Sequence, residues 1–111
     1  MGRLNPVTAM QYFTTDLDGV TMVDPPAAVR RQILASVEQD EEADYPEVYL
    51  TIPSVIVLAY CRGGVLLWED EGEAIRRLVG ISIDRAEAAW SMAVEGRIEE
   101  LLDLPWQDLD S

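Results

Sequence analysis

Residues 45–52 show the clearest alternation of apolar and polar positions in the chain. Two interleaved sets make up the pattern: apolar Val48, Leu50 and Ile52, and polar Glu47, Tyr49 and Thr51. A period of two is that of a half-buried β-strand. The continuous apolar run over residues 55–61 predicts a central strand, and a turn at 62–64 leads into a further strand at 65–68. Three strands joined by tight turns predict an antiparallel meander.

The N-terminal third predicts a hairpin followed by a helix. Residues 10–15 and 20–23 are rich in β-branched and aromatic side chains. The Asp-Gly pair at 18–19 is typical of a type I′ turn, which needs a positive φ. After Asp24, which suits an N-cap, apolar side chains recur at helical spacing to about Gln39.

The last third predicts further helices. Residues 73–79 have the composition of one or two helical turns stopped by Gly80. A longer helix is expected from Asp84, where Glu87 completes a capping-box-like start, to Gly96 at its C-terminus. Its apolar face comprises Ala86, Ala89, Trp90 and Ala93. A short helix with Ile98, Leu101 and Leu102 follows and ends before Pro105.

These elements indicate an α+β fold in two layers. We expect an antiparallel sheet of about four to five strands, with about two to four helices packed mainly on one face. Residues 1–111 are expected to form one domain, in which 1–9 and 107–111 are irregular.

The amino-acid composition excludes several catalytic mechanisms. The chain has no His, its eight basic residues are all Arg, and Cys61 is its single cysteine. Histidine-based acid–base catalysis, Ser-His-Asp and Cys-His nucleophiles, lysine Schiff bases and the P-loop lysine are therefore excluded. A single cysteine cannot form an internal disulfide, which fits a reducing compartment. We expect no enzymatic activity and no cofactor.

The charge of the chain bears on its partners. The chain has 21 acidic and 8 basic residues, which gives a net charge of −13. Such a chain is repelled by nucleic-acid phosphates and by anionic membranes, and it attracts cationic proteins or metal ions. The alternative is that the acidity only keeps the protein soluble. Because neither a signal peptide nor an apolar run of roughly 18 residues is present, we expect a cytoplasmic protein.

Two acidic clusters are the candidate partner-binding sites. The first comprises Trp68, Glu69, Asp70, Glu71 and Glu73, and the second comprises Asp40, Glu41, Glu42, Asp44 and Tyr45. Tyr49, on the polar face of its strand, and Trp106 are further interface candidates, since Tyr and Trp are enriched at binding hot spots. The meander puts the two clusters at opposite ends of the sheet, so one partner could touch both only along a face or an edge.

Three further candidate sites carry weaker signals. Asp16 and Asp18 resemble the opening of a calcium loop, but Val20 and Thr21 stand where the pattern needs a ligand and a Gly, so we expect no metal. Glu47 and Glu69 could be neighbours on the sheet, yet so small a domain has little room for a substrate cleft. Cys61 is expected in the core, although the adjacent Arg62 could lower the pKa of an exposed thiol.

The second half of the chain carries a resemblance. A strand pair, VIVLAYCRGGVLLWED, is followed by an Ala-rich helix, a Gly and a Pro-Trp close, DRAEAAWSMAVEGRIEELLDLPWQ. Over residues 45–106 this order resembles small immunity proteins of bacterial polymorphic and contact-dependent toxin systems. The resemblance implies a cytoplasmic, non-catalytic protein that binds a cognate toxin domain and blocks its active site.

Two other functions stay open from the sequence. An acidic secretion-type chaperone or adaptor would bind extended segments through apolar grooves. A phage-type inhibitor would mimic nucleic acid and bind a basic nucleic-acid-processing enzyme, as charge complementarity favours.

Overall fold

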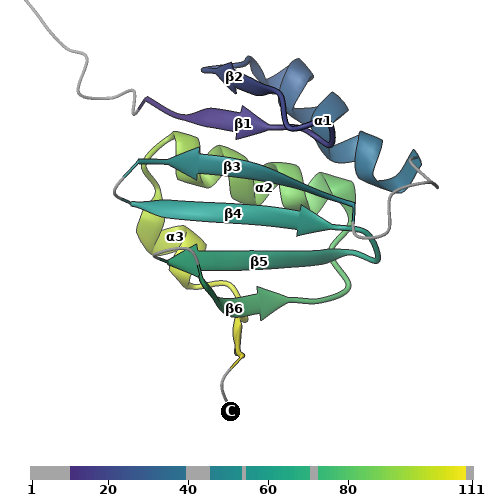
Figure 1. Ribbon diagram of the computed structural model, residues 1–111. Coiled ribbons are helices and arrows are strands. Elements are labelled where there is room, and N and C mark those ends of the chain that lie inside the picture. The colour runs from purple at the N-terminus through teal and green to yellow at the C-terminus, as the bar shows by residue number, and fades with distance from the viewer. Residues whose placement is uncertain (1–10, 40–45, 54, 71–72, 110–111) are drawn as a thin grey trace, which may run out of the picture.

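The computed structural model describes residues 11–39, 46–53, 55–70 and 73–109, in which seven strands form one antiparallel sheet and three helices lie against it (Figure 1). The strands are β1 (Phe13–Thr15), β2 (Thr21–Val23), β3 (Glu47–Ile52), β4 (Ile56–Cys61), β5 (Val65–Asp70), β6 (Glu73–Leu78) and β7 (Gln107–Asp108). The helices are α1 (Ala27–Gln39), α2 (Ile83–Val94) and α3 (Ile98–Leu102). The sheet order is β2-β1-β3-β4-β5-β6-β7, and the helices lie on one side of it. The expected α+β class is confirmed, with more strands than expected.

The core lies between the sheet and the helices. The alternation of β3 is confirmed: its apolar set faces the helices and is at most 2% exposed. These side chains pair across the strands with the helix-facing side chains of β4, Ile56, Leu58 and Tyr60. Leu34 and Val37 of α1 and Trp90 of α2 are fully buried against them. Ala86, Ala89 and Ala93 of α2 are also buried, and such small side chains let a helix lie close to a sheet.

The prediction of helical turns over residues 73–79 is wrong. These residues form β6, whose side chains alternate in exposure and end at Leu78, paired with Leu66 of β5. Glu, Ala, Arg and Leu favour helices on their own, but pairing with β5 outweighs that weak preference. The expected irregular tail is likewise wrong for Gln107 and Asp108, which pair with Arg77 and Arg76 as β7.

The first hairpin is confirmed, but its turn differs from the predicted type. Only Gly19 of the Asp-Gly pair has a positive φ, of 81°, whereas a type I′ turn needs two such residues. The Asp16 carboxylate accepts hydrogen bonds from the backbone N–H groups of Asp18 and Val20, at 2.9 Å each. A five-residue loop, residues 16–20, therefore joins β1 to β2 and contains the left-handed Gly19.

The helix starts also differ from those predicted. Asp24 does not cap α1; its carboxylate accepts from the Tyr12 N–H at 3.0 Å. Ser82, rather than Asp84, caps α2, and its hydroxyl accepts from the Arg85 N–H at 3.2 Å. The predicted stop at Gly96 is confirmed, since it has a φ of 78° and follows the C-cap residue.

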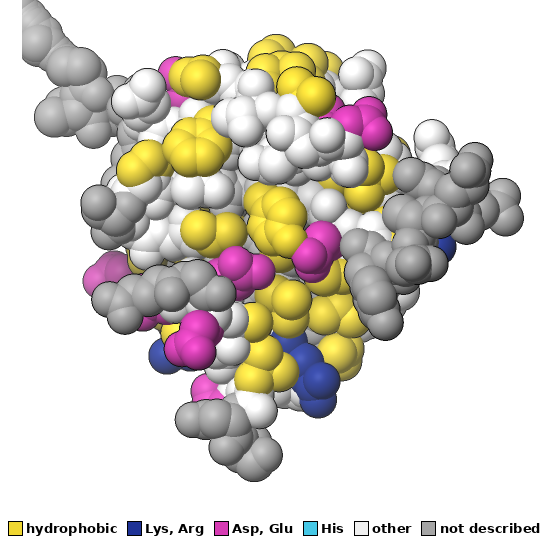
Figure 2. All heavy atoms as spheres, viewed as in Figure 1, with side chains coloured by type: hydrophobic (Ala, Val, Ile, Leu, Met, Phe, Trp, Pro, Cys, Tyr) yellow, Lys and Arg dark blue, Asp and Glu magenta, His cyan; other side chains and the backbone are white. Residues whose placement is uncertain are grey.

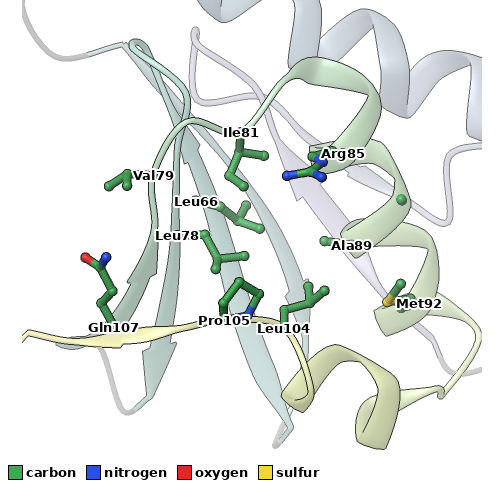
Figure 3. A pocket seen from close by; sticks show the side chains of 11 residues that line it. Leu66, Leu78, Val79, Ile81, Arg85, Ala89, Met92, Leu104, Pro105 and Gln107 are labelled. Carbon is green, nitrogen blue, oxygen red and sulfur yellow. The ribbon is translucent and has the colours of Figure 1, made fainter.

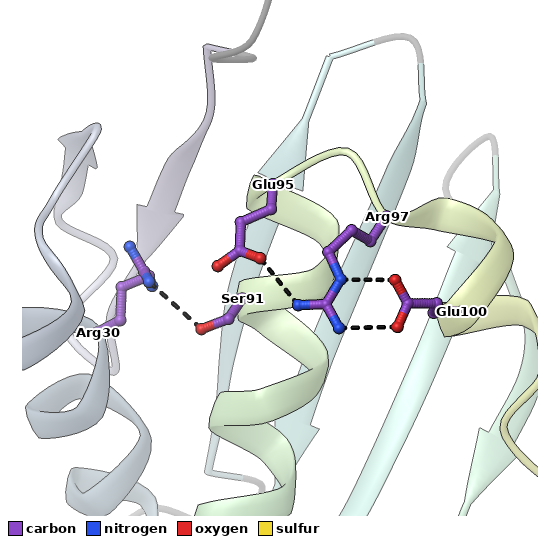
Figure 4. Close-up of polar contacts among 5 residues, drawn as sticks. All are labelled: Arg30, Ser91, Glu95, Arg97 and Glu100. Atoms are coloured by element: carbon purple, nitrogen blue, oxygen red, sulfur yellow. Dashed lines mark hydrogen bonds and ion pairs between the residues drawn. The ribbon is translucent and has the colours of Figure 1, made fainter.

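Two arginines form polar contacts between the helices (Figure 4). Arg30 of α1 is 8% exposed and donates to Ser91 of α2 at 3.4 Å and to the Tyr12 hydroxyl at 2.7 Å. Arg97 lies at the corner between α2 and α3 and pairs with Glu95 at 2.9 Å and with Glu100 at 2.6 Å. The helices thus form one layer behind the sheet.

Gly64 gives a stability test of the turn between β4 and β5. It has a φ of 77°, and a Cβ there would lie 2.9 Å from the Ile81 carbonyl oxygen. We expect Gly64→Ala to lower the free energy of unfolding by about 2–4 kcal/mol, from left-handed strain and backbone overlap together. Gly63→Ala is the control, because φ is 92° there but nothing lies within 4 Å. Backbone strain alone should lower the free energy of unfolding of Gly63→Ala by about 1–2 kcal/mol. If urea denaturation shows that both variants lose the same free energy of unfolding, the close contact between Gly64 and Ile81 is contradicted.

Candidate functional site

One face of the sheet lies away from the helices, and no helix of the described chain covers it (Figure 1). We call this surface the open face. The strand register puts these side chains on it: Phe13, Thr15, Glu47, Tyr49, Thr51, Val57, Ala59, Cys61, Val65, Leu67, Glu69 and, opposite Leu67, Arg77 of β6. Figure 2 shows hydrophobic side chains gathered over this face, with acidic side chains between them. An uncovered apolar patch rimmed by polar groups is typical of an interaction site.

Glu47 anchors one end of the open face. Its carboxylate accepts a hydrogen bond from the Tyr49 hydroxyl on the same strand and a second from the Cys61 thiol, at 3.6 Å to sulfur. Burial raises the pKa of the Tyr49 hydroxyl, and the hydrogen bond to Glu47 raises it further. Tyr49 and Glu47 therefore hold each other in place beside the centre of the face.

Cys61 is not an activated thiol. Burial raises its pKa to about 12, and the charge and hydrogen bond of Glu47 add to this effect. The idea that Arg62 lowers the pKa of the thiol is wrong, because the Arg62 guanidinium turns away and donates to the Val37 carbonyl at 3.3 Å. A thiol that stays protonated at neutral pH is a poor nucleophile.

Glu69 lies on the open face opposite Val57 and is half-buried. Within the described residues its carboxylate has no hydrogen bond and no ion pair, in contrast to Glu47. Burial raises the pKa of this carboxyl, and the nearby charge of Glu47 raises it further. The described chain thus leaves a partly desolvated negative charge without a cation, which is expected to lower the stability of the fold at neutral pH.

A hollow adjoins Glu69. It has a volume of about 350 Å³ and lies between the β3–β4 turn and the end of β5. Thr51, Val57 and Pro53 form apolar and neutral walls, and the carboxylates of Glu69 and Asp70 line its acidic side. An extended side chain with a cationic end fits this combination of apolar walls and acidic end.

The titration of Glu69 can be tested by its effect on stability. Its raised pKa means that the folded chain binds more protons than the unfolded chain, so the free energy of unfolding falls as pH rises through the carboxyl range. Glu69→Gln removes this loss and should raise the free energy of unfolding near neutral pH. The gain should stay below about 1 kcal/mol, because water still reaches the carboxyl.

Urea denaturation at neutral pH and at about pH 3.5, below the ordinary carboxyl pKa, measures this effect. The gain in the free energy of unfolding should vanish at the acidic pH, because the protonated Glu69 of the wild type and the Gln of the variant are both neutral there. Glu99→Gln, at an exposed position of α3, is the control that makes the same change of charge on the other side of the sheet. A Glu69→Gln variant that is less stable at neutral pH would contradict the desolvation of this carboxylate.

The structure separates the residues of the first predicted cluster. Trp68 points to the helix side, where its ring packs edge-on against the Trp106 ring with 5.3 Å between the ring centres. The Arg76 guanidinium lies 5.6 Å from the centre of the Trp68 ring. Glu69 points to the opposite side, onto the open face, because side chains alternate along a strand. Asp70 and Glu73 pair at the exposed end of the β5–β6 hairpin.

The remaining predicted residues fall into three groups. Tyr49 lies on the open face with Glu47, as its place in the alternation predicts. Trp106 serves packing, since its ring covers Trp68 and its N–H donates to the Leu101 carbonyl at 2.8 Å. Glu71 and the second cluster lie outside the described residues: Asp40, Glu41, Glu42, Asp44 and Tyr45.

Sequence reasoning missed the apolar centre of the open face. Val57, Ala59 and Leu67 are adjacent there, although the run over residues 55–61 indicates a strand buried on both sides. The available signal was the polar set of β3, because the neighbours of Glu47 and Tyr49 on β4 must share their face.

Metal binding, membrane crossing and similarity to known proteins add no functional assignment to the described chain. Within the described ranges, no three acidic, His or Cys side chains are placed to hold a metal ion. Nor does that part of the chain contain a helix with the length and apolar character to cross a membrane. No known family, curated protein or solved structure matches the chain.

Proposed function

We propose that this protein is a non-catalytic inhibitor that binds a basic protein through the open face, in the manner of a toxin-neutralising immunity protein. The observation that carries the proposal is the half-buried Glu69 carboxylate on the open face, which forms no ion pair with any residue that the structure describes. A charge kept at a cost to stability is typical of a functional position.

The two parts of the open face would do different work in binding. The half-buried Val57 and Leu67, which flank the fully buried Ala59, offer apolar area, whose burial drives association. Glu47 and Glu69 would select an Arg or Lys of the partner, and Glu69 would gain an ion pair that it does not make within the described residues. Tyr49, rigid and amphipathic beside them, suits a binding hot spot.

The net charge of −13 supports a cationic partner. It would accelerate encounter with a basic surface and weaken binding to other acidic proteins. Enzymes that process nucleic acids carry such surfaces around their active sites, because they must bind phosphates. Covering that surface would block the substrate without any catalysis by the inhibitor. The resemblance of residues 45–106 to immunity proteins points to the same function.

Capture from a lysate of the source cell tests the proposal. The immobilised protein is compared with two variants that add the same charge, Leu67→Glu on the open face and Leu102→Glu on α3, where Leu102 is 44% exposed. We expect wild type and Leu102→Glu to retain one basic protein that elutes with salt, and Leu67→Glu to lose it. If acidity alone drives capture, Leu67→Glu will retain as much as wild type, and the proposal fails.

A further inference from the structure

A second concave site lies on the helix side of the sheet (Figure 3). It is a pocket of about 430 Å³ between β5, β6, α2 and the segment after α3. Its apolar lining comprises Leu66, Leu78, Ile81, Ala89, Met92 and Leu104. Helix α2 packs over β3 and β4, and the pocket lies beside it, toward Leu78 of β6. Ligand sites in proteins have this size and are mostly apolar with a few polar groups.

Arg85 supplies the charged group of this pocket, where Gln107 is a second polar residue of the lining. Because of its charge, Arg85 is the one of the two that suits an anionic ligand. Its side chain extends from the first turn of α2 toward Ile81, across the pocket (Figure 3). Among the arginines in the described ranges, Arg85 is the one whose guanidinium makes no hydrogen bond or ion pair.

The nearest acidic side chains on the same helix are already engaged elsewhere. Asp84 and Glu87 both pair with Arg31 of α1, at 2.6 Å and 2.8 Å. Arg85 is exposed to solvent, so its guanidinium is free to meet a ligand at the entrance of the apolar pocket. A guanidinium in that position suits a carboxylate, which it can bind through two parallel hydrogen bonds.

We propose that this pocket binds an aliphatic monocarboxylate, with the hydrocarbon chain among the apolar side chains and the carboxylate on Arg85. One guanidinium without a second cation matches a single negative charge better than a phosphate. The pocket lies across the sheet from the open face, so this proposal does not depend on the proposed function.

Decanoate is the probe, titrated below its micelle concentration and followed by calorimetry and by backbone NMR. We expect saturable binding at one site, with shifted amide signals in β6 and the first turns of α2. Arg85→Gln should weaken it about tenfold, the loss of one charged hydrogen-bonded pair. Decan-1-ol should bind wild type about as weakly as decanoate binds Arg85→Gln.

A filled pocket provides the matched control. Ala88 is an exposed lining residue, so Ala88→Trp can occupy the space while the fold, checked by circular dichroism, is kept. Decanoate should not bind this variant. The proposal is overturned if decanoate fails to bind wild type at millimolar concentration, if decylamine binds as well as decanoate, or if Ala88→Trp binds normally.

Discussion

Replacing Glu69 with Arg is expected to raise the Kd of the captured basic partner at least about a hundredfold. The substitution removes the unpaired carboxylate of the open face and places a cation against the basic group of the partner. Juxtaposed like charges at an interface cost several kcal/mol, and about 3 kcal/mol corresponds to a hundredfold change. The variant itself should fold, because Glu69 contributes no hydrogen bond or ion pair within the described chain.

The control for this prediction is Glu99→Arg. It changes the net charge by the same amount, from −13 to −11, but lies on exposed α3 on the other side of the sheet. It should weaken binding no more than about threefold, through the smaller long-range attraction. Calorimetry with the purified partner measures both variants. Equal losses would show that total charge, rather than the open face, determines affinity.

Trp90→Ala is expected to lower the free energy of unfolding by about 3–5 kcal/mol. Trp90 is fully buried in α2 and is the largest such side chain in the described chain. Its removal leaves a cavity between α2 and the sheet that the alanines around it cannot fill. Since a domain of this size has a total stability of about 5–15 kcal/mol, this one change would remove a large share of it.

Trp90→Phe separates packing from hydrogen bonding at the same position. The indole N–H is buried and has no partner among the described protein atoms. Phe keeps most of the ring and removes that N–H, so it should cost less than about 2 kcal/mol. Urea denaturation of the three proteins gives the order wild type, Phe, Ala. A loss with Phe as large as with Ala would mean that the N–H, not the ring, stabilises the core.

Most of the fold could be predicted because its strongest signals are local. The alternation of Val48, Leu50 and Ile52 identifies β3, and Gly96 ends α2 as the sequence indicates. The prediction for residues 73–79 is wrong because Glu, Ala and Arg favour a helix locally. The pairing with β5 that makes this segment a strand leaves no pattern in the segment itself. Strand β7 is missed for the same reason, since two residues carry no period.

The candidate site could be predicted only in part, because strand alternation decides which neighbours in sequence share a surface. Trp68 and Glu69 are adjacent in the chain and were grouped, yet one packs on Trp106 and the other lies on the open face. Tyr49 was found because its strand alternates clearly. Leu67 was missed because nothing in a short apolar run tells which side of the sheet the helices cover.

NMR mapping of the complex tests the central claim most directly. Isotope-labelled protein is titrated with the captured basic partner, and the backbone amide signals of the whole domain are followed. The proposed interface predicts changes at Tyr49, Ala59, Leu67 and Glu69, with the signals of α1 and α2 unchanged. Changes confined to the helices, with those four signals unmoved, would contradict the assignment of the open face as the binding surface.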